Sequence, residues 1–344
     1  MKSDKPISQD HQQQNENENK NEKNQKEKSK RVRRWGPYEL ERKIGEGSFG
    51  KVYSSKDYAL KKIVRVIQGE VPMKPSEFRE MIDNEIKINR ILADSEATVP
   101  MYDLENQVED DYAWLVFKRM DGPLHKYEIN NPCAISKKLI ECVYKLHTLN
   151  VVHRDIKPQN ILVSIHKRES IERKEKGPIS LRLCDLGMAR VLNADTIGST
   201  AKWTDYVTTR WYRAPEVLYG NYSPEQTKAS DMWSVGCVIA GFYLNRPLFP
   251  GSSVLDQARL IGYALGLPGL VESWNPATTP MSKKMQTLIY ESAKEAARAP
   301  RLYGEFKLAH LLRDVPSIPK DLITNLLTYS TKDRLSAREA LRYF

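Results

Sequence analysis

The sequence predicts an α+β protein with two parts that follow an N-terminal tail. Residues 1–34 consist mainly of Asn, Gln, Glu and Lys, and a segment with so few apolar side chains is expected to be disordered. Residues 35–120 hold short strand-like runs and one helical pattern, whereas residues 121–344 hold mainly helical patterns. We place the boundary between the two parts at residues 121–123, Asp-Gly-Pro, where turn-forming residues interrupt the chain.

The composition is that of a globular protein with a substantial core. Apolar residues make up 40% of the chain, and aromatic residues are spread over residues 35–344. No apolar run reaches the roughly 18 residues that a membrane span needs, and the first 30 residues lack the apolar segment of a signal peptide. The four cysteines show neither a Cys-x-x-Cys pair nor a metal-binding spacing: Cys133, Cys142, Cys184 and Cys237. Free thiols in a reducing compartment, the cytoplasm or the nucleus, are therefore expected.

The net charge of +10 is diffuse. Residues 1–34 carry ten Lys and Arg against six Asp and Glu, which leaves +6 for the rest of the chain. Such a surplus suits acidic or phosphorylated protein partners as well as RNA, so no specific nucleic-acid partner is predicted. The basic run at residues 30–34 could be read by a nuclear import receptor, although a solvated linker is the simpler interpretation.

A glycine-rich turn lies near the start of the globular part. Residues 41–44 read as a strand, residues 45–50 are Gly-Glu-Gly-Ser-Phe-Gly, and residues 51–53 read as a returning strand. Glycines allow the backbone of such a hairpin to lie close over phosphates. A dinucleotide-binding unit would continue into a helix after its glycines, whereas a strand follows here.

A polar octet, His-Arg-Asp-Ile-Lys-Pro-Gln-Asn, occupies residues 153–160. An amphipathic helical run at residues 136–149 precedes it, and the strand-like residues 161–163 follow it. Polar side chains on a loop between two apolar segments are typical of active sites. The loop offers one carboxylate, Asp155, that could accept a proton and one amide, Asn160, that could bind a cation.

Two further motifs follow in the second half. A strand-like run at residues 181–184 leads into Asp-Leu-Gly at residues 185–187. Residues 204–216 read Thr-Asp-Tyr-Val-Thr-Thr-Arg-Trp-Tyr-Arg-Ala-Pro-Glu. A charged insertion at residues 166–178 separates two strand-like segments, and we interpret it as a tolerated surface loop.

Taken in order, these motifs resemble those of the protein kinases. The glycine motif G-x-G-x-x-G-x-V, the loop H-R-D-x-x-x-x-N, Asp-Leu-Gly in place of Asp-Phe-Gly, and Ala-Pro-Glu all occur in the family order. The Thr-Asp-Tyr motif, Thr-Arg-Trp-Tyr-Arg and residues 245–251 are similar to the mitogen-activated group of the CMGC superfamily. The resemblance implies the two-lobed kinase fold, with a small lobe of five strands and one helix at residues 35–120 and a mostly helical lobe at residues 121–344.

The resemblance also implies an ATP site. Its residues would come from the glycine loop, from the strand at residues 58–63 and from the strand at residues 112–117 with the hinge after it. They are Ile44, Gly45, Gly47, Ser48, Phe49, Gly50, Val52, Ala59, Lys61, Phe117, Lys118 and Met120. Phe117 would lie behind the adenine, and the backbone of Lys118 and Met120 would bind it.

Lys61 would contact the α- and β-phosphates and pair with a glutamate of the helix at residues 77–92. Lys62 is the competing lysine, but a one-residue offset places it on the opposite face of its strand. Glu85 is the favoured partner because Glu-Ile-Lys-Ile resembles the related kinases, and Glu80 is the alternative.

For phosphoryl transfer, the resemblance assigns Asp155 to the substrate hydroxyl and its proton, and Lys157 to the transferring phosphate. Asn160 and Asp185 would hold Mg²⁺. Lys157 indicates the serine/threonine class, and the related kinases act on Ser or Thr followed by proline. Asp231 would brace the catalytic loop, and Arg334 would pair with Glu216.

Activation by phosphorylation at Thr204 and Tyr206 is implied too, with an upstream kinase and a phosphatase as partners beside protein substrates. The expected phosphate anchors are Arg154 and Arg190 for Thr204, and Arg210 and Arg213 for Tyr206. Related kinases add two arginines of the glutamate helix to the threonine site. Here those positions hold Asn84 and Met81, and Arg79 faces roughly opposite to Met81.

Several alternatives remain open at this stage. A ciliary-type kinase of the same superfamily shares Thr-Asp-Tyr, and a cyclin-dependent-like kinase is the other rival. A pseudokinase scaffold is disfavoured because all five residues that such scaffolds tend to lose are present: Lys61, Glu85, Asp155, Asn160 and Asp185. The sequence ends at Phe344, where related kinases continue into an acidic docking site, so docking through such a site is not expected unless the sequence is truncated.

Overall fold

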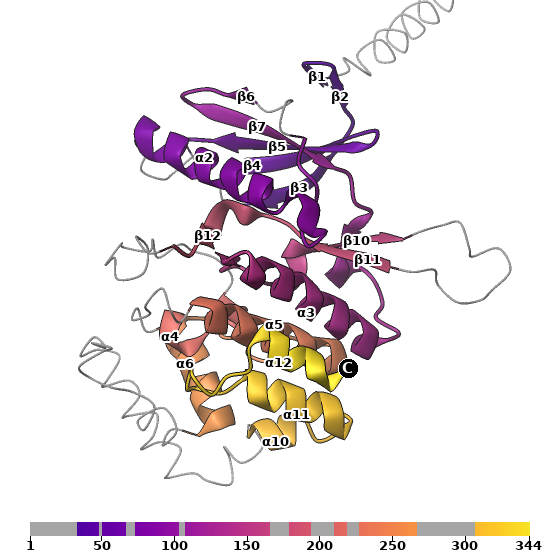
Figure 1. Cartoon of the computed structure of the whole chain (residues 1–344), viewed down its shortest axis with the longest axis vertical. Coiled ribbons are helices and arrows are strands. Elements are labelled where there is room, and N and C mark those ends of the chain that lie inside the picture. The colour runs from indigo at the N-terminus through magenta and orange to yellow at the C-terminus, as the bar shows by residue number, and fades with distance from the viewer. Residues whose placement is uncertain are drawn as a thin grey trace, which may run out of the picture.

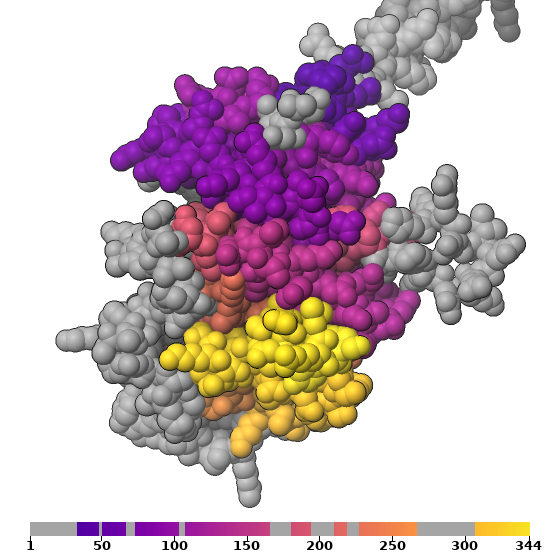
Figure 2. Space-filling view, in the orientation of Figure 1, coloured from indigo at the N-terminus to yellow at the C-terminus, as the bar shows by residue number. Residues whose placement is uncertain are grey.

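The computed structural model describes residues 33–47, 50–66, 73–102, 107–165, 179–193, 210–218, 227–266 and 307–344. In these residues it has the two-lobed arrangement of a protein kinase, with a sheet-rich small lobe above a helical large lobe (Figure 1). Figure 2 shows the middle of the sequence, in magenta, as a band between the violet small lobe and the yellow C-terminal helices. None of the helices in these ranges is long and apolar enough to cross a membrane.

The small lobe is built on an antiparallel sheet of five strands, in the order β3-β4-β5-β7-β6. The bounds are β3 Lys43–Gly47, β4 Gly50–Ser55, β5 Tyr58–Val64, β6 Gln107–Val108 and β7 Tyr112–Lys118. Only Lys56 and Asp57 separate β4 from β5, and Lys56 has a left-handed φ of 40°. This tight turn brings Val52 opposite Lys61, and β7 brings Phe117 opposite Ala59.

Helix α2, Pro75–Ile91, covers one face of this sheet (Figure 1). The sequence predicted it at residues 77–92, and the structure starts it at Pro75, because proline has a helix-compatible φ at the first turn. Phe78, Ile82 and Ile86 are buried against Ile63 and other apolar residues of the sheet. This packing turns Glu85 toward the region between the lobes.

The other face of the sheet carries an aromatic cluster that the hairpin β1 (Arg33–Trp35) and β2 (Tyr38–Leu40) covers. The rings of Trp35 and Trp114 stack with centroids 5.1 Å apart. Strand β1 begins at Arg33, two residues inside the segment predicted as a tail at residues 1–34. Arg33 and Arg34 are exposed, and they are held by the pairing of β1 with β2 and by the aromatic contact of the adjacent Trp35, which composition alone did not indicate.

The large lobe packs its helices around α5, which is buried along nearly its whole length. Its helices in the described ranges are α3 Pro132–Thr148, α4 Pro215–Leu218, α5 Thr227–Leu244, α6 Val254–Leu265, α10 Leu308–Leu311, α11 Ser317–Leu326 and α12 Ala337–Ala340. The sequence predicted α3 at residues 136–149. It starts at Pro132 instead, because the side chain of Asn131 accepts a hydrogen bond from the Ala134 amide, 3.0 Å away.

The remaining described elements are short strands and 3-10 turns, several of which border the cleft. Strands β8 (Gly122–Pro123), β10 (Ile161–Ile165) and β11 (Ile179–Leu183) form one sheet, and β9 (Val151–Val152) pairs with β12 (Arg190–Val191). The 3-10 turns are Ala93–Ser95, Leu124–Lys126, Pro158–Asn160, Leu186–Met188, Arg210–Tyr212 and Leu341–Tyr343. The antiparallel pairing of β10 with β11 places the insertion, residues 166–178, between two paired strands, and the insertion itself lies outside the described residues.

Candidate active site

A cleft of about 970 Å³ lies between the lobes and is lined by both of them. Ten of the twelve residues predicted to bind the nucleotide line it: Ile44, Gly45, Gly47, Gly50, Val52, Ala59, Lys61, Phe117, Lys118 and Met120. Ser48 and Phe49 lie outside the described residues. The predicted catalytic and metal-binding residues Lys61, Glu85, Asp155, Lys157, Asn160 and Asp185 line the same cleft.

Gly50 allows the strands at one end of the cleft to approach closely. A Cβ atom at this position would lie 1.8 Å from the carbonyl oxygen of Lys62, a backbone atom that cannot move aside independently. Any other residue would therefore push β4 away from β5 and shift the backbone at the end of the glycine loop.

The hinge between the lobes presents backbone groups to the cleft. The amide of Lys118 donates to the Pro100 carbonyl at 2.9 Å, and the amide of Asp121 donates to the Val163 carbonyl at 3.0 Å. The Met120 amide has no partner among the described residues, although Met120 is 8% exposed. Met120 lines the cleft, so its amide is placed to donate to a hydrogen-bond acceptor there, such as adenine.

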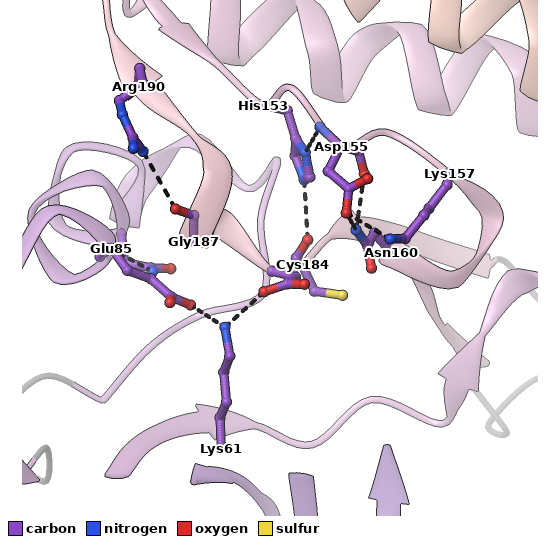
Figure 3. Close-up of polar contacts among 11 residues, drawn as sticks. Lys61, Glu85, His153, Asp155, Lys157, Asn160, Cys184, Gly187 and Arg190 are labelled. Carbon is purple, nitrogen blue, oxygen red and sulfur yellow. Dashed lines mark hydrogen bonds and ion pairs between the residues drawn. The ribbon is translucent and has the colours of Figure 1, made fainter. Parts of the chain in front are cut away.

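The ammonium group of Lys61 lies between two carboxylates (Figure 3). Its Nζ is 2.7 Å from Glu85 Oε1 and 2.7 Å from Asp185 Oδ1. Lys62, on the other strand face, instead lies over the rings of Tyr112 and Trp114. The structure therefore contains the ion pair with Glu85 that the sequence favoured over the one with Glu80.

Lys61, Glu85 and Asp185 shift the pKa values of one another. Burial lowers the pKa of Lys61, but the attraction of Asp185 and Glu85 outweighs it, so the pKa is raised and the amine is held protonated. Burial raises the pKa of Glu85, although the charge of Lys61 opposes the change. The charge of Lys61 lowers the pKa of Asp185, whose side chain is 45% exposed in the cleft. A protonated lysine is the form that binds phosphate oxygens.

Across the cleft, Asp155 receives hydrogen bonds from two neighbours on its own loop (Figure 3). Lys157 Nζ is 2.7 Å and Asn160 Nδ2 is 3.0 Å from Asp155 Oδ2. Burial raises the pKa of Asp155 and the charge of Lys157 lowers it, with the net effect upward. A carboxylate with a raised pKa is a stronger base than an exposed aspartate, which suits proton abstraction.

His153 fixes the loop from inside and occupies one tautomer. Its Nδ1 accepts from the Asp155 amide at 3.3 Å, so the proton must be on Nε2, which donates to the Cys184 carbonyl at 3.1 Å (Figure 3). The ring thereby connects the residue before Asp185 to the loop that carries Asp155.

Asp231 of α5 braces the same loop from below. Its carboxylate accepts from the amides of His153 and Arg154, both at 2.8 Å, and from His147 Nε2 at 3.0 Å. Arg154 has a left-handed φ of 67°, which costs energy for a residue with a side chain, and these bonds offset that cost. The hydrogen bonds from His147 and His153 keep the pKa of Asp231 low although its burial opposes this.

The residues predicted to bind the activation phosphates lie in two places. Strand pairing places Arg190 opposite Val152, which is two residues before Arg154 in the chain. The Nη1 of Arg154 donates to the Met188 carbonyl at 3.2 Å. Arg210 and Arg213 lie at the turn before α4. Thr204 and Tyr206, the predicted phosphorylation sites, lie outside the described residues.

An ion pair joins Glu216 of α4 to Arg334 near the C-terminus. Arg334 Nη1 lies 2.7 Å from Glu216 Oε1 and Arg334 Nη2 lies 3.1 Å from Glu216 Oε2, as the sequence predicted. The Arg334 guanidinium also lies over the Trp233 ring, 5.2 Å from its centre.

The donor set fits Mg²⁺. Asn160 uses its amide nitrogen for Asp155, which leaves its amide oxygen for a cation, and Asp185 uses one carboxylate oxygen for Lys61. Magnesium in proteins takes such oxygens, usually one or two carboxylates together with phosphates of the substrate. Asn160 and Asp185 supply two of the ligands, and phosphates of the substrate would complete the site.

Sequence reasoning missed a polar network behind the hinge. Arg119 Nη1 donates to Glu41 Oε2 at 3.2 Å and to the Lys56 carbonyl at 2.8 Å, while Ser54 Oγ donates to the same Glu41 oxygen at 3.0 Å. Glu41 was predicted in a strand that starts only at Lys43. No local pattern marks this network, because its members are scattered from residue 41 to residue 119.

Comparison with known proteins gives a consistent result. The sequence profile of the family described as "Protein kinase domain" matches residues 38–344. Mitogen-activated protein kinase 13 of Oryza sativa subsp. indica is 31% identical over 319 residues, which cover 88% of this chain and 57% of the relative. Mitogen-activated protein kinase 17 of Arabidopsis thaliana is 30% identical over 324 residues, covering 88% and 59%.

A third relative, mitogen-activated protein kinase 11 of Oryza sativa subsp. japonica, is 31% identical over 319 residues, covering 88% of this chain and 50% of the relative. The chain thus spans between half and three fifths of the length of these curated relatives. With the family profile spanning nearly all of the globular part, the chain belongs to the protein kinase family, as a member that resembles the mitogen-activated kinases.

Proposed function

We propose that the protein is a serine/threonine kinase that transfers the γ-phosphoryl group of ATP to Ser or Thr of protein substrates. One observation carries the proposal: the ammonium of Lys61 lies between Glu85 and Asp185, in the same cleft as Asp155 with its Lys157 and Asn160 partners. A pseudokinase scaffold has no need to keep both groups of residues in one cleft.

Each residue has a role that follows from its place in the cleft. The glycine loop and the Met120 amide hold the nucleotide, and Lys61 neutralises its phosphates. Asp155 orients the substrate hydroxyl and accepts its proton, while the ammonium of Lys157 stabilises negative charge that develops on the transferring group. Fixing these groups in a cleft supplies much of the rate enhancement, since phosphoryl transfer needs mainly positioning and charge neutralisation.

Asn160 and Asp185 would hold Mg²⁺, which supplies positive charge to the β- and γ-phosphates when it is bound. Asp185 reaches Lys61 with one oxygen and keeps the other for the ion. Asp185 would thus serve both Lys61 and the metal ion through its two carboxylate oxygens.

Substrate choice and activation follow from the similarity to the mitogen-activated kinases. We expect Ser or Thr followed by proline, and activation by an upstream kinase at Thr204 and Tyr206 with reversal by a phosphatase. Arg154 and Arg190 would bind phosphate on Thr204, and Arg210 and Arg213 would bind phosphate on Tyr206.

Incubation of purified protein with Mg-ATP tests the proposal. The acceptors are myelin basic protein and three matched peptides that carry Ser-Pro, Ser-Ala or Tyr-Pro, with Asp155→Asn as the control for contaminating kinases. Phosphate on the Ser-Pro peptide that exceeds that on the other two supports the proposal. Equal labelling by wild type and Asp155→Asn would show a scaffold without chemistry, and preference for Tyr-Pro would exclude the serine/threonine class.

A further inference from the structure

Helix α2 contacts the segment after Asp185 through a side chain to which no function was assigned above. Asn84 precedes Glu85 in the helix, is partly buried, and donates a hydrogen bond from Nδ2 to the carbonyl of Ala189 at 3.1 Å. The two residues are 105 positions apart in the chain. The bond connects the helix that carries Glu85 to the turn that follows Asp185.

The acceptor of this bond is held firmly. Ala189 is fully buried, its amide donates to the Leu186 carbonyl at 3.0 Å, and Arg190 Nη1 donates to the Ala189 carbonyl at 2.7 Å. A carbonyl oxygen has two lone pairs, so it can accept from Arg190 and Asn84 together. The Asn84 amide therefore binds a fixed point four residues beyond Asp185.

Apolar packing of Phe78, Ile82 and Ile86 decides which face of α2 meets the sheet, but it does not hold the helix at a single angle about its axis. Ile88 and Leu92, at the end of the helix, belong to the same buried cluster as Leu186. Such contacts are non-directional and tolerate rotation of the helix about its axis. The rotation matters, because a Cβ atom on Gly187 would lie only 3.4 Å from Glu85 Oε2, so the glutamate passes close to this turn.

We propose that Asn84 is a positioning residue that fixes the rotation of α2 and so holds Glu85 in its ion pair with Lys61. The proposal rests on the role given above to that ion pair. A neutral amide on a backbone carbonyl needs no phosphate, so this contact supports the closed helix position whether or not the enzyme is phosphorylated.

Asn84→Ala tests the proposal with little risk to folding. Alanine is a better helix former than asparagine, so the helix itself is not weakened. We expect kcat to fall about three- to tenfold, the range of one neutral hydrogen bond, with the KM for peptide and the melting temperature unchanged. Lys87→Ala, an exposed position on the same helix, is the matched control and should behave as wild type.

A double-mutant cycle shows whether Asn84 acts through Glu85. Single-turnover rates are measured for wild type, Asn84→Ala, Glu85→Gln and the double variant. If Asn84 only positions Glu85, its substitution has no further effect once Glu85→Gln has removed the ion pair. Additive losses, an unchanged kcat in Asn84→Ala, or a loss in kcat that follows a lowered melting temperature would each overturn the proposal.

The same cycle separates this inference from the proposed function. If Glu85→Gln alone leaves the rate unchanged, the role of the Lys61–Glu85 pair is wrong and Asn84 cannot act through it. If Glu85→Gln is slow while Asn84→Ala is normal, only the role of Asn84 is wrong.

Discussion

Asn160 donates from its side-chain amide to Asp155 at 3.0 Å, so the proposed metal ligand and the proposed base share one hydrogen bond. A second bond, from Asn160 Nδ2 to the Asp155 carbonyl at 2.9 Å, fixes the amide in the same orientation. The amide oxygen is thereby directed away from Asp155. Binding of a cation at Asn160 and the orientation of the base are therefore coupled through a single side chain.

Asp155→Asn is expected to keep the fold and nucleotide binding and to lower turnover by about 10²–10⁴-fold, the usual contribution of a general base. The amide has the same shape but cannot accept the hydroxyl proton. Turnover is measured with a peptide substrate, and affinity with a fluorescent nucleotide. Retention of a tenth or more of the wild-type turnover would contradict the role of Asp155.

Lys157→Ala should shift the acidic limb of the kcat/KM pH profile to higher pH. The charge of Lys157 lowers the pKa of Asp155, so its removal lets burial raise that pKa further, and the base then needs a higher pH to be ionised. The midpoint of the limb is compared with those of wild type and of Lys137→Ala, an exposed position on α3. A limb that stays in place, or moves to lower pH, would show that Asp155 is not the titrating group.

Asp185→Ala is expected to remove the Mg²⁺ dependence of nucleotide binding. The substitution deletes the only carboxylate of the proposed metal site, so Mg²⁺ would no longer join the phosphates to the protein. ATP affinity is measured by calorimetry with Mg²⁺ and with EDTA, and Asp314→Ala, whose wild-type side chain is 89% exposed, is the control. An Asp185→Ala protein that still binds more tightly with Mg²⁺ would rule the assignment out.

Tyr206→Phe should cost more activity than Thr204→Ala, with fully phosphorylated protein as the reference. Both arginines expected for the tyrosine phosphate are present, whereas the two helix positions expected to assist the threonine phosphate hold Met81 and Asn84. Charge-assisted hydrogen bonds contribute about 1.5–3 kcal/mol each. Without the two helix arginines, the protein is therefore expected to bind the Thr204 phosphate more weakly than the Tyr206 phosphate. Because Asn84 instead donates to the Ala189 carbonyl, α2 already has a phosphate-independent contact.

Peptide phosphorylation by the two variants measures this order directly. A larger loss in Thr204→Ala would mean that another cation reaches that phosphate. Asn84→Arg offers a further check, since restoring an arginine there should increase the effect of Thr204→Ala.

Arg334→Leu should destabilise the large lobe by about 3–5 kcal/mol, because it leaves the carboxylate of Glu216 buried without its partner. The Arg334 side chain is fully buried and that of Glu216 is 8% exposed. Urea unfolding gives the free energy, and Arg313→Leu, at a side chain that is 63% exposed, is the control. A loss below about 1 kcal/mol would place the pair among weak surface ion pairs.

Much of the fold and of the site could be predicted from the sequence. The glycine loop, the strand–turn–strand pattern and the order of the motifs are local properties, since residue type and spacing decide turns, strand faces and helix faces. The alternation of strand β5 alone separates Lys61 from Lys62. The predicted starts of α2 and α3 were two and four residues too late, because Pro75 and the Asn131 cap lie outside the periodic pattern.

Tertiary structure decided which distant groups meet. Glu85 rather than Glu80 reaches Lys61 because Phe78, Ile82 and Ile86 pack against the sheet, which leaves the helix face that carries Glu85 toward the cleft. Asn84 was recognised from the sequence only as a missing arginine, and its bond to Ala189 depends on how two lobes close on each other. Periodicity specifies the faces of each element, but only the packing of elements far apart in the chain brings a particular donor within hydrogen-bonding distance of its acceptor.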